Sequence, residues 1–407
     1  SSNCVGMSAA YDSVNQKVVV AFADTSGPFG RAVVGTVSGN AITFGGLGTF
    51  ASLISVSATS CVYDPNTQRI VVAYKDDTNG VGAAAVGTVS GTSITFGAST
   101  NFFSGVLGAT MRAVYDALAQ RTVIAFIDGI SGQGRVAVGA VSGTSITFGS
   151  TPTFSPGSAN EVSAAYDANA QKVVITYSAG TGVAIVGTTS ATSMTFGTGV
   201  AFVTPGPNAT SIAYDASALK VVIAYQAPTT SFGTAVVGTV SGTSISFGTP
   251  VVFQSSAIDN ASTVYDSDVQ KVVISYNGTS NFGTAILGTV SGTSISFSTT
   301  VVFQSAAISL TSSASAYNTA AQRTVTAYRL TTGGTARAVV TSATTSTPNL
   351  TSENFIGFSS AAYTNGQTAT IQLVGSVNTA QSGLTAGQSY FVLTDGTLSL
   401  TAGSPSV

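Results

Sequence analysis

Acidic and basic side chains recur along this sequence at fixed distances from a tyrosine, and this spacing is the first feature that could carry chemistry. An Asp follows the tyrosine in six copies and an Asn in the seventh, and a Lys or Arg comes five positions later. Paired carboxylates could perform acid–base catalysis. The same Asp in six copies instead favours a turn residue that accepts backbone amides and meets the nearby Lys or Arg. The recurring residues are Tyr11, Asp12 and Lys17; Tyr63, Asp64 and Arg69; Tyr115, Asp116 and Arg121; Tyr166, Asp167 and Lys172; Tyr214, Asp215 and Lys220; Tyr265, Asp266 and Lys271; Tyr317, Asn318 and Arg323.

Several residue types on which enzymes rely are missing. The 407 residues include no His and no Trp. Without His, the chain has no Ser-His-Asp or Cys-His site and no histidine-ligated zinc. The net charge of −2 leaves no basic surface for nucleic acid, and no apolar run reaches the roughly 20 residues that span a bilayer. We therefore predict that the chain is not an enzyme and has no catalytic residues, cofactor, metal, nucleic-acid partner or membrane insertion.

The tyrosines lie 48 to 52 residues apart and divide the chain into seven units. Each unit has a small apolar run that ends at the tyrosine, a β-branched run such as KVVVAF, a run like RAVVGTV and a run that begins SITFG. The last two are joined by a Ser-Gly turn, as in VSGTSITFG at 89–97. Four antiparallel strands in such a unit are typical of a β-propeller blade, whereas β-solenoid coils, the alternative, are usually shorter.

The predicted fold is therefore all-β: a seven-bladed β-propeller over residues 1–348, followed by a small β-rich module over 349–407. Cys4 and Cys61 stand at different offsets from the tyrosines of their units, so we expect two buried thiols rather than a disulfide. Two Phe residues six positions apart recur in six units, and an even spacing in a strand places both rings on one face. We expect them to pack each blade against its neighbour: 44 with 50, 96 with 102, 148 with 154, 196 with 202, 247 with 253, and 297 with 303.

Strand alternation divides the connections between two faces of such a propeller. One face carries the regular turns, and the other carries irregular loops between the second and third strands. Variable loops on a repeated frame are suited to ligand contact. Residues 76–80 have the composition of a calcium loop but neither its spacing nor its closing Glu. The candidate binding residues at the loop tips are Phe29, Asp76, Asp77, Asn79, Asp128, Gln133, Phe232, Asn281 and Phe282, with the alternative that the three Phe rings tuck against their blades.

The seventh unit departs from the repeat after residue 343, where no SITFG run follows. Either residues 349–358 supply the missing strand and help to close the ring, or a strand from upstream of residue 1 does so. We expect the chain to continue beyond both residue 1 and residue 407. Arg112 and Glu161 are the polar residues that stand out in the first strands, which are expected to surround the axis.

Residues 353–407 contain NFIGF, GQTATIQLVG, QSGLTAGQSYFVLTDGTLS and TAGSPSV. This region resembles a small β module near the C-termini of marine bacteriophage tail proteins, and the propeller repeats resemble those that accompany it. The resemblance implies a tail fibre or tail appendage protein of the virion. It also implies other tail proteins and a host-surface glycan or protein as partners. Such fibres are commonly homotrimers, although no heptad or triple-helical repeat in this chain specifies one.

Three functions remain open from the sequence. The first is a non-enzymatic phage tail protein that contacts the host. The second is a secreted or surface adhesin, or a filament subunit, located outside a bacterial cell. The third is a propeller glycosidase with Arg112 and Glu161 near its centre, although the sialidase-like Asp boxes that end in Trp are missing.

Overall fold

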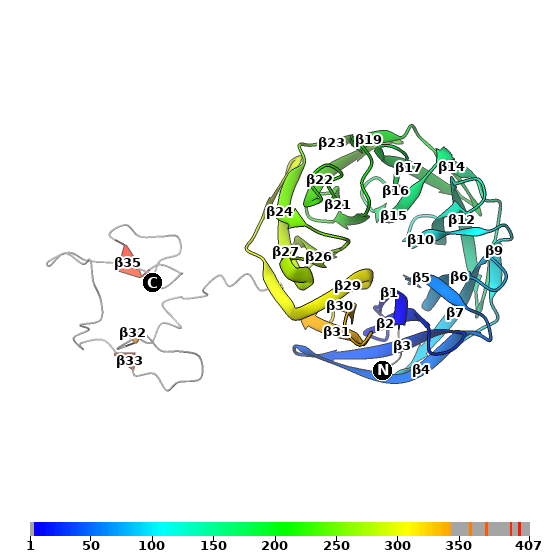
Figure 1. The fold of residues 1–407 in the computed structure, drawn as a ribbon, viewed down its shortest axis with the longest axis horizontal. Coiled ribbons are helices and arrows are strands. Elements are labelled where there is room, and N and C mark those ends of the chain that lie inside the picture. The colour runs from blue at the N-terminus through cyan, green and yellow to red at the C-terminus, as the bar shows by residue number, and fades with distance from the viewer. Residues whose placement is uncertain (1–3, 343–357, 360–370, 373–390, 393–397, 400–407) are drawn as a thin grey trace. The chain divides into compact units, whose positions relative to one another are not determined.

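The computed structural model describes residues 4–342 and four two-residue strands nearer the C-terminus. The chain divides into two compact units, Ser1–Ala343 and Thr344–Val407. The first is a β-propeller whose antiparallel sheets follow one another around a ring (Figure 1). In the second, β32 (Phe358–Ser359) pairs with β33 (Ile371–Gln372), and β34 (Phe391–Val392) pairs with β35 (Leu398–Ser399). The predicted all-β class and four-stranded antiparallel repeats are confirmed.

Each repeat unit begins near the axis and ends at the rim of the ring. The second strand is buried almost throughout, which explains its continuous β-branched sequence, because a strand covered on both faces has no polar side. The units contain, in order, β1 (Cys4–Asp12), β2 (Lys17–Asp24), β3 (Phe29–Ser38) and β4 (Ala41–Ser52); β5 (Val56–Asp64), β6 (Arg69–Asp76), β7 (Val81–Ser90), β8 (Ser93–Phe96) and β9 (Thr100–Phe103); β10 (Leu107–Asp116), β11 (Arg121–Asp128), β12 (Gln133–Ser142), β13 (Ser145–Phe148) and β14 (Thr153–Ser158); β15 (Asn160–Asp167), β16 (Lys172–Ser178), β17 (Gly182–Ser190), β18 (Ser193–Phe196) and β19 (Val200–Val203).

The later units repeat this arrangement until the sixth, where one long strand joins two units. The first half of β29 pairs with β27 at the rim, and its second half pairs with β30 near the axis. The elements are β20 (Thr210–Asp215), β21 (Lys220–Gln226), β22 (Phe232–Ser241), β23 (Ser244–Phe247) and β24 (Val251–Ala257); β25 (Ala261–Asp266), β26 (Lys271–Asn277), the 3₁₀ turn η1 (Thr279–Asn281), β27 (Phe282–Ser291), β28 (Ser294–Phe297) and β29 (Val301–Asn318); β30 (Arg323–Leu330) and β31 (Ala336–Thr341).

The outer strand of most units is broken in two, which the sequence did not predict. In the second unit, β8 and β9 both pair with β7, and the residues between them start at Gly97. A side chain at Gly97 would collide with the backbone carbonyl of Thr144 in the next unit's turn. Glycine is therefore required where the outer strand passes this close to the next unit's turn, although β4 runs unbroken through the equivalent Gly45.

The paired Phe residues pack neighbouring units together, as predicted. The second Phe of one unit contacts the first Phe of the next: the ring centroids of Phe50 and Phe96 lie 5.7 Å apart, and those of Phe102 and Phe148 lie 5.8 Å apart. The second Phe also contacts an aromatic ring on the second strand of the next unit, such as Tyr74, whose centroid lies 5.2 Å from that of Phe50. Edge-to-face contacts of this kind add to the free energy gained by burial.

Turn residues also join the units. The Tyr166 hydroxyl accepts a hydrogen bond from Leu118 N of the preceding unit, at 3.1 Å. Arg69 Nε donates to the Gly143 carbonyl of the following unit, at 3.1 Å. The expected contact between the turn Asp and the Lys or Arg after it is not among the ion pairs of the described residues. That expectation was wrong for arginines such as Arg69, which instead contact the neighbouring unit.

The seventh unit meets the first through the same kinds of contact. Tyr11 Oη accepts from Ala320 N at 3.2 Å, and Arg323 Nε donates to Asn40 Oδ1 at 3.1 Å. β1 and β2 also share a hydrophobic cluster with β30 and β31. The ring is therefore closed by packing between its two ends in the described part of the chain.

This closing junction leaves an apolar cavity at the rim. Among the described residues β31 pairs only with β30, so the seventh unit has no outer strand. The cavity has a volume of about 330 Å³, and it is lined by residues that include Phe44 and Leu47, which are 43% and 50% exposed. In other units, two glycines of the third strand make room for the Ile and Phe side chains of the outer strand. The register places Thr341 and Ala336 of β31 at these two glycine positions. Residues 349–357, predicted to help close the ring, lie outside the described residues.

Candidate functional site

The irregular connections interlock into one surface, which we call the loop face. Leu107 N donates to the Gly80 carbonyl, and Gly129 N donates to the Val106 carbonyl, so loops of successive units are joined. The two-face division predicted from strand alternation is therefore observed. The loop face comprises residues 25–28, 53–55, 77–80, 104–106, 129–132, 159, 179–181, 204–209, 227–231, 258–260, 278–281 and 331–335.

Buried aspartates shape the loops of the first three units. Asp128 lies at the end of β11 and accepts hydrogen bonds from Ile130 N and Ser131 N. Burial alone would raise the pKa of Asp128, but these amides and the Arg135 guanidinium outweigh burial and bring the pKa below its usual value. Asp24 and Asp76 occupy the same place in the first two units. Of the nine candidate binding residues, Asp76 and Asp128 therefore hold the backbone of their own loops in place.

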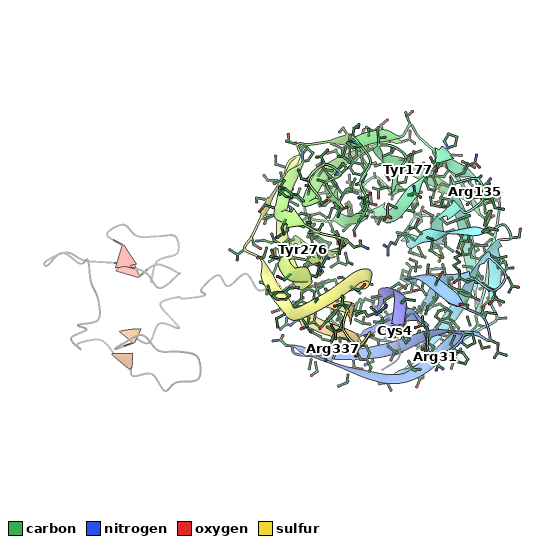
Figure 2. All side chains as sticks on the ribbon, viewed as in Figure 1. Cys4, Arg31, Arg135, Tyr177, Tyr276 and Arg337 are labelled. Atoms are coloured by element: carbon green, nitrogen blue, oxygen red, sulfur yellow. The ribbon has the colours of Figure 1, made fainter. Side chains whose placement is uncertain are left out.

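Two arginines outside the tyrosine repeat pair with these aspartates. Arg31 Nε lies 2.9 Å from Asp24 Oδ2, and Arg135 Nε lies 3.3 Å from Asp128 Oδ2. Figure 2 labels both arginines on the ring. The Arg31 guanidinium also lies over the ring of Phe29, 4.6 Å from its centroid. The equal spacing of seven residues from Asp to Arg in both units was a signal that could have identified these pairs.

The calcium-like segment does not gather oxygen ligands. Asn79 donates from its backbone amide and its side chain to Asp76, while Asp77 forms an ion pair of 3.3 Å with Lys75. No group of three or more Cys, Asp or Glu side chains within the described residues could hold a metal ion. These side chains therefore hold the loop together.

The remaining candidates lie apart from one another. Phe29, Phe232 and Phe282 are half-buried at the start of third strands, whereas Asn281 is exposed. The Gln133 side-chain oxygen accepts a hydrogen bond of 3.0 Å from Arg135. The nine candidates come from five different units and line neither of the two described cavities. Their role in ligand contact remains a prediction for a broad surface, not for a pocket.

The loop face also exposes apolar side chains that sequence reasoning missed. Leu53, Val106 and Ile130 belong to the first three units, and the most exposed of them, Leu53, is 80% exposed. Val106 and Ile130 lie close together because the carbonyl of Val106 accepts a hydrogen bond from Gly129 N. An exposed apolar group beside polar loops is a common feature of binding surfaces.

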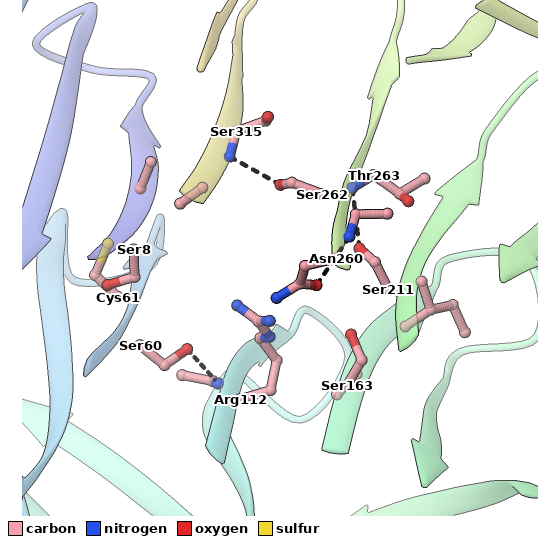
Figure 3. Close-up of a pocket in the computed structure, with 16 residues that line it drawn as sticks. Ser8, Ser60, Cys61, Arg112, Ser163, Ser211, Asn260, Ser262, Thr263 and Ser315 are labelled. Carbon is pink, nitrogen blue, oxygen red and sulfur yellow. Dashed lines mark hydrogen bonds between the residues drawn. The ribbon is translucent and has the colours of Figure 1, made fainter. Parts of the chain in front are cut away.

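A separate polar cavity lies among the first strands and has a volume of about 160 Å³ (Figure 3). Five units place a serine three residues before the repeat tyrosine, and each of these serines lines the cavity: Ser8, Ser60, Ser163, Ser211 and Ser262. Several join adjacent units: Ser60 Oγ accepts from Ala113 N at 2.8 Å, and Ser262 Oγ accepts from Ser315 N at 2.9 Å. We call this space the axial cavity.

Arg112 occupies the serine position in the third unit and points into the axial cavity (Figure 3). Its Nε is buried and has no hydrogen-bond partner. Burial lowers the pKa of Arg112, and Cys61 and Glu161 partly oppose this shift. Burial raises the pKa of Glu161, and Arg112 partly offsets it. The sequence analysis expected both residues near the axis, and the structure places Arg112 on the cavity wall.

No protein-family model and no curated protein matches the chain. Solved structures that resemble it include AofleA from Arthrobotrys oligospora, at 11% identity and a TM-score of 0.45 over 74% of this chain and 88% of that one. Another is a lectin from Aleuria aurantia, described as a six-bladed β-propeller with a novel fucose recognition mode, at 12% identity and a TM-score of 0.45 over 75% and 99%. A third is SapL1 lectin with alpha methyl fucoside, also at 12% and 0.45, over 75% and 96%. Identities and scores this low say nothing about a ligand of this chain.

No helix in the described residues is long and apolar enough to cross a membrane.

Proposed function

We propose that this chain is a non-enzymatic display protein of a phage tail, and that its loop face binds a receptor on the host surface. The observation that carries the proposal is the contrast between the frame and the loops. The same Tyr, Phe and turn contacts recur from unit to unit, whereas the loop face differs in every unit. A rigid frame that presents varied loops is suited to contact with a ligand.

We further propose that the seven units form a seven-bladed propeller. The Tyr11–Ala320 bond between the seventh unit and the first supports this count, because it matches the Tyr166–Leu118 bond between interior units. We also propose that residues 349–407 form a small β-rich module, and that the chain is a trimer that binds other tail proteins in the virion. These proposals rest on the resemblance of residues 353–407 to tail-protein modules. Light scattering on the purified chain tests the trimer directly.

Binding to host cells is the test of the loop face. Fluorescent protein is titrated against host cells and against a panel of glycans, with Ile130→Ser as the loop-face variant. Leu118→Ser is the matched control, because Leu118 is also exposed and belongs to the same unit but lies in a turn on the opposite face. We expect at least a fivefold loss of cell binding for Ile130→Ser and none for Leu118→Ser. Equal binding by both variants would contradict a receptor site on this part of the loop face.

The alternative context is an adhesin or filament subunit outside a bacterial cell. Cryo-electron microscopy of the native particle separates the two contexts. Density for the propeller at the outer end of a tail supports the phage role, whereas density within a cellular filament excludes it. Hydrolysis of a glycan from the panel by the purified chain would revive the glycosidase hypothesis.

A further inference from the structure

Arg112 stands where five other units have a serine, and three of these serines, Ser60, Ser211 and Ser262, join neighbouring units through a backbone amide. A serine at this position accepts an amide of the next unit, as Ser211 Oγ does from Thr263 N at 2.9 Å. A guanidinium has five donors and no acceptor, so Arg112 cannot repeat this bond to the fourth unit. The chain therefore loses an inter-unit hydrogen bond and places a cation where the repeat has a hydroxyl.

The charge on Arg112 is not neutralised by a direct partner. None of the ion pairs among the described residues involves Arg112. Burial raises the pKa of the Cys61 thiol to about 11, so this neighbour is uncharged at neutral pH. Among the described residues, Glu161 is the carboxylate that acts electrostatically on Arg112, and it lies beyond the 4.0 Å limit of an ion pair. The Nε of Arg112 is enclosed, although the side chain as a whole is only half-buried. A partly desolvated cation without a close partner favours a negative charge beside it.

The walls around Arg112 offer hydrogen-bond donors. Ser60, Ser211 and Ser262 each accept a backbone amide through Oγ, so each hydroxyl proton stays available to donate elsewhere. All three residues line the same cavity as Arg112. A cation and hydroxyl donors on the walls of one cavity are complementary to an oxyanion. The volume of about 160 Å³ is the space of roughly five waters, enough for a small anion that keeps part of its hydration.

We propose that the axial cavity is a binding site for a small oxyanion, with Arg112 as its charged anchor and the serine hydroxyls as donors. The ligand is a carboxylate, sulfate or phosphate group. It is either a free inorganic ion or the acidic group of a sugar. The site is separate from the loop-tip residues of the proposed receptor surface, so either proposal can fail without the other.

The test is titration calorimetry of the full chain with sulfate, phosphate, glucuronate and N-acetylneuraminate, in chloride buffer. Arg112→Ser restores the residue of five other units and should fold. We expect it to weaken anion binding at least tenfold. Arg337→Ser is the matched control, because it removes the same charge from an exposed side chain outside the axial cavity. Equal affinities for the wild type and Arg112→Ser, or no binding by the wild type, would overturn the proposal.

Three further comparisons identify the ligand class, the effect of the neighbouring charge and the place. Tighter binding of the sugar acids than of sulfate assigns the site to acidic glycans, and the reverse assigns it to an inorganic ion. Glu161→Gln removes the nearby negative charge, so anion affinity should rise severalfold, and a fall would contradict the account. In wild-type crystals soaked in selenate, the anomalous peak should lie beside Arg112, and peaks found only elsewhere would refute the site.

Discussion

The ring of Phe50 packs against the ring of Phe96 with their centroids 5.7 Å apart, although the two residues belong to neighbouring sheets. The same contact recurs at four further junctions, from Phe102 and Phe148 to Phe253 and Phe297. Phe44 has no such partner among the described residues, in which the seventh unit has no outer strand, and it is 43% exposed. The repeated Phe residues thus occupy equivalent positions in the sequence but contribute different amounts to the free energy of unfolding.

Replacing Phe102 with Ala should therefore destabilise the propeller far more than replacing Phe44. Phe102 is buried and contacts both Phe126 and Phe148. Its loss should lower the free energy of unfolding by about 3–5 kcal/mol. Phe44→Ala should cost roughly 1 kcal/mol, because much of its ring is already in water. Urea denaturation followed by circular dichroism measures both values, and equal losses would show that the junctions do not depend on this pair.

One turn between third and fourth strands is strained in a way that can be relieved. The second residue of this turn is a glycine with φ near +60° in five units, but Ala191 adopts φ of 52° in the fourth. A side chain in this left-handed region costs about 1–2 kcal/mol. Ala191→Gly should therefore stabilise the protein by about 1 kcal/mol, after the added freedom of glycine in the unfolded chain is subtracted.

Gly91→Ala is the converse substitution. Gly91 has φ of 58°, and a Cβ there would meet nothing within 4 Å, so strain alone is tested. We expect a loss of about 1 kcal/mol. Thermal denaturation of both variants checks the pair. Opposite shifts support the strain argument, whereas a destabilised Ala191→Gly contradicts it.

The turn aspartate should tolerate Asn but not Ala. Asp116 Oδ1 accepts Ala119 N at 3.0 Å, and Asn318 Oδ1 accepts Ala321 N at the same distance in the seventh unit. Because the charge is not needed for this bond, Asp116→Asn should change the free energy of unfolding by roughly 1 kcal/mol or less. Asp116→Ala leaves a half-buried amide without its acceptor and should cost about 1–2 kcal/mol. Denaturation midpoints decide this, and a severe loss for Asp116→Asn would assign a role to the charge.

The features that could be predicted from the sequence are those that repeat. The tyrosine period, the paired Phe residues and the Ser-Gly turn each reflect a contact that recurs in most units, so their spacing indicates the architecture. The pair between Asp24 and Arg31 depends on hairpin register, which the period alone does not give. The separation of the nine loop candidates depends on how far apart the units lie around the ring. The surroundings of Arg112, including its unpaired Nε, are formed by the first strands of several units together. The sequence could therefore show that Arg112 is unusual at its position but not what lies around it.

The propeller should lose stability at alkaline pH through its buried tyrosines. Burial raises the pKa of Tyr225 and of Tyr276 to about 12, while a tyrosine in an unfolded chain titrates near 10. Below pH 10 both states hold the phenol proton, and pH has no effect through these groups. Between about pH 10 and 12 the unfolded chain has released protons that the folded protein retains, so the free energy of unfolding falls as pH rises.

Tyr276→Phe removes one such group, together with the hydrogen bond from Tyr276 Oη to Gln254 Oε1. Its stability at pH 8 should be somewhat lower than that of the wild type, but its decline between pH 10 and 11 should be shallower. Urea midpoints at pH 8, 10 and 11 measure both quantities, and identical slopes for the two proteins would mean that other groups govern the alkaline transition.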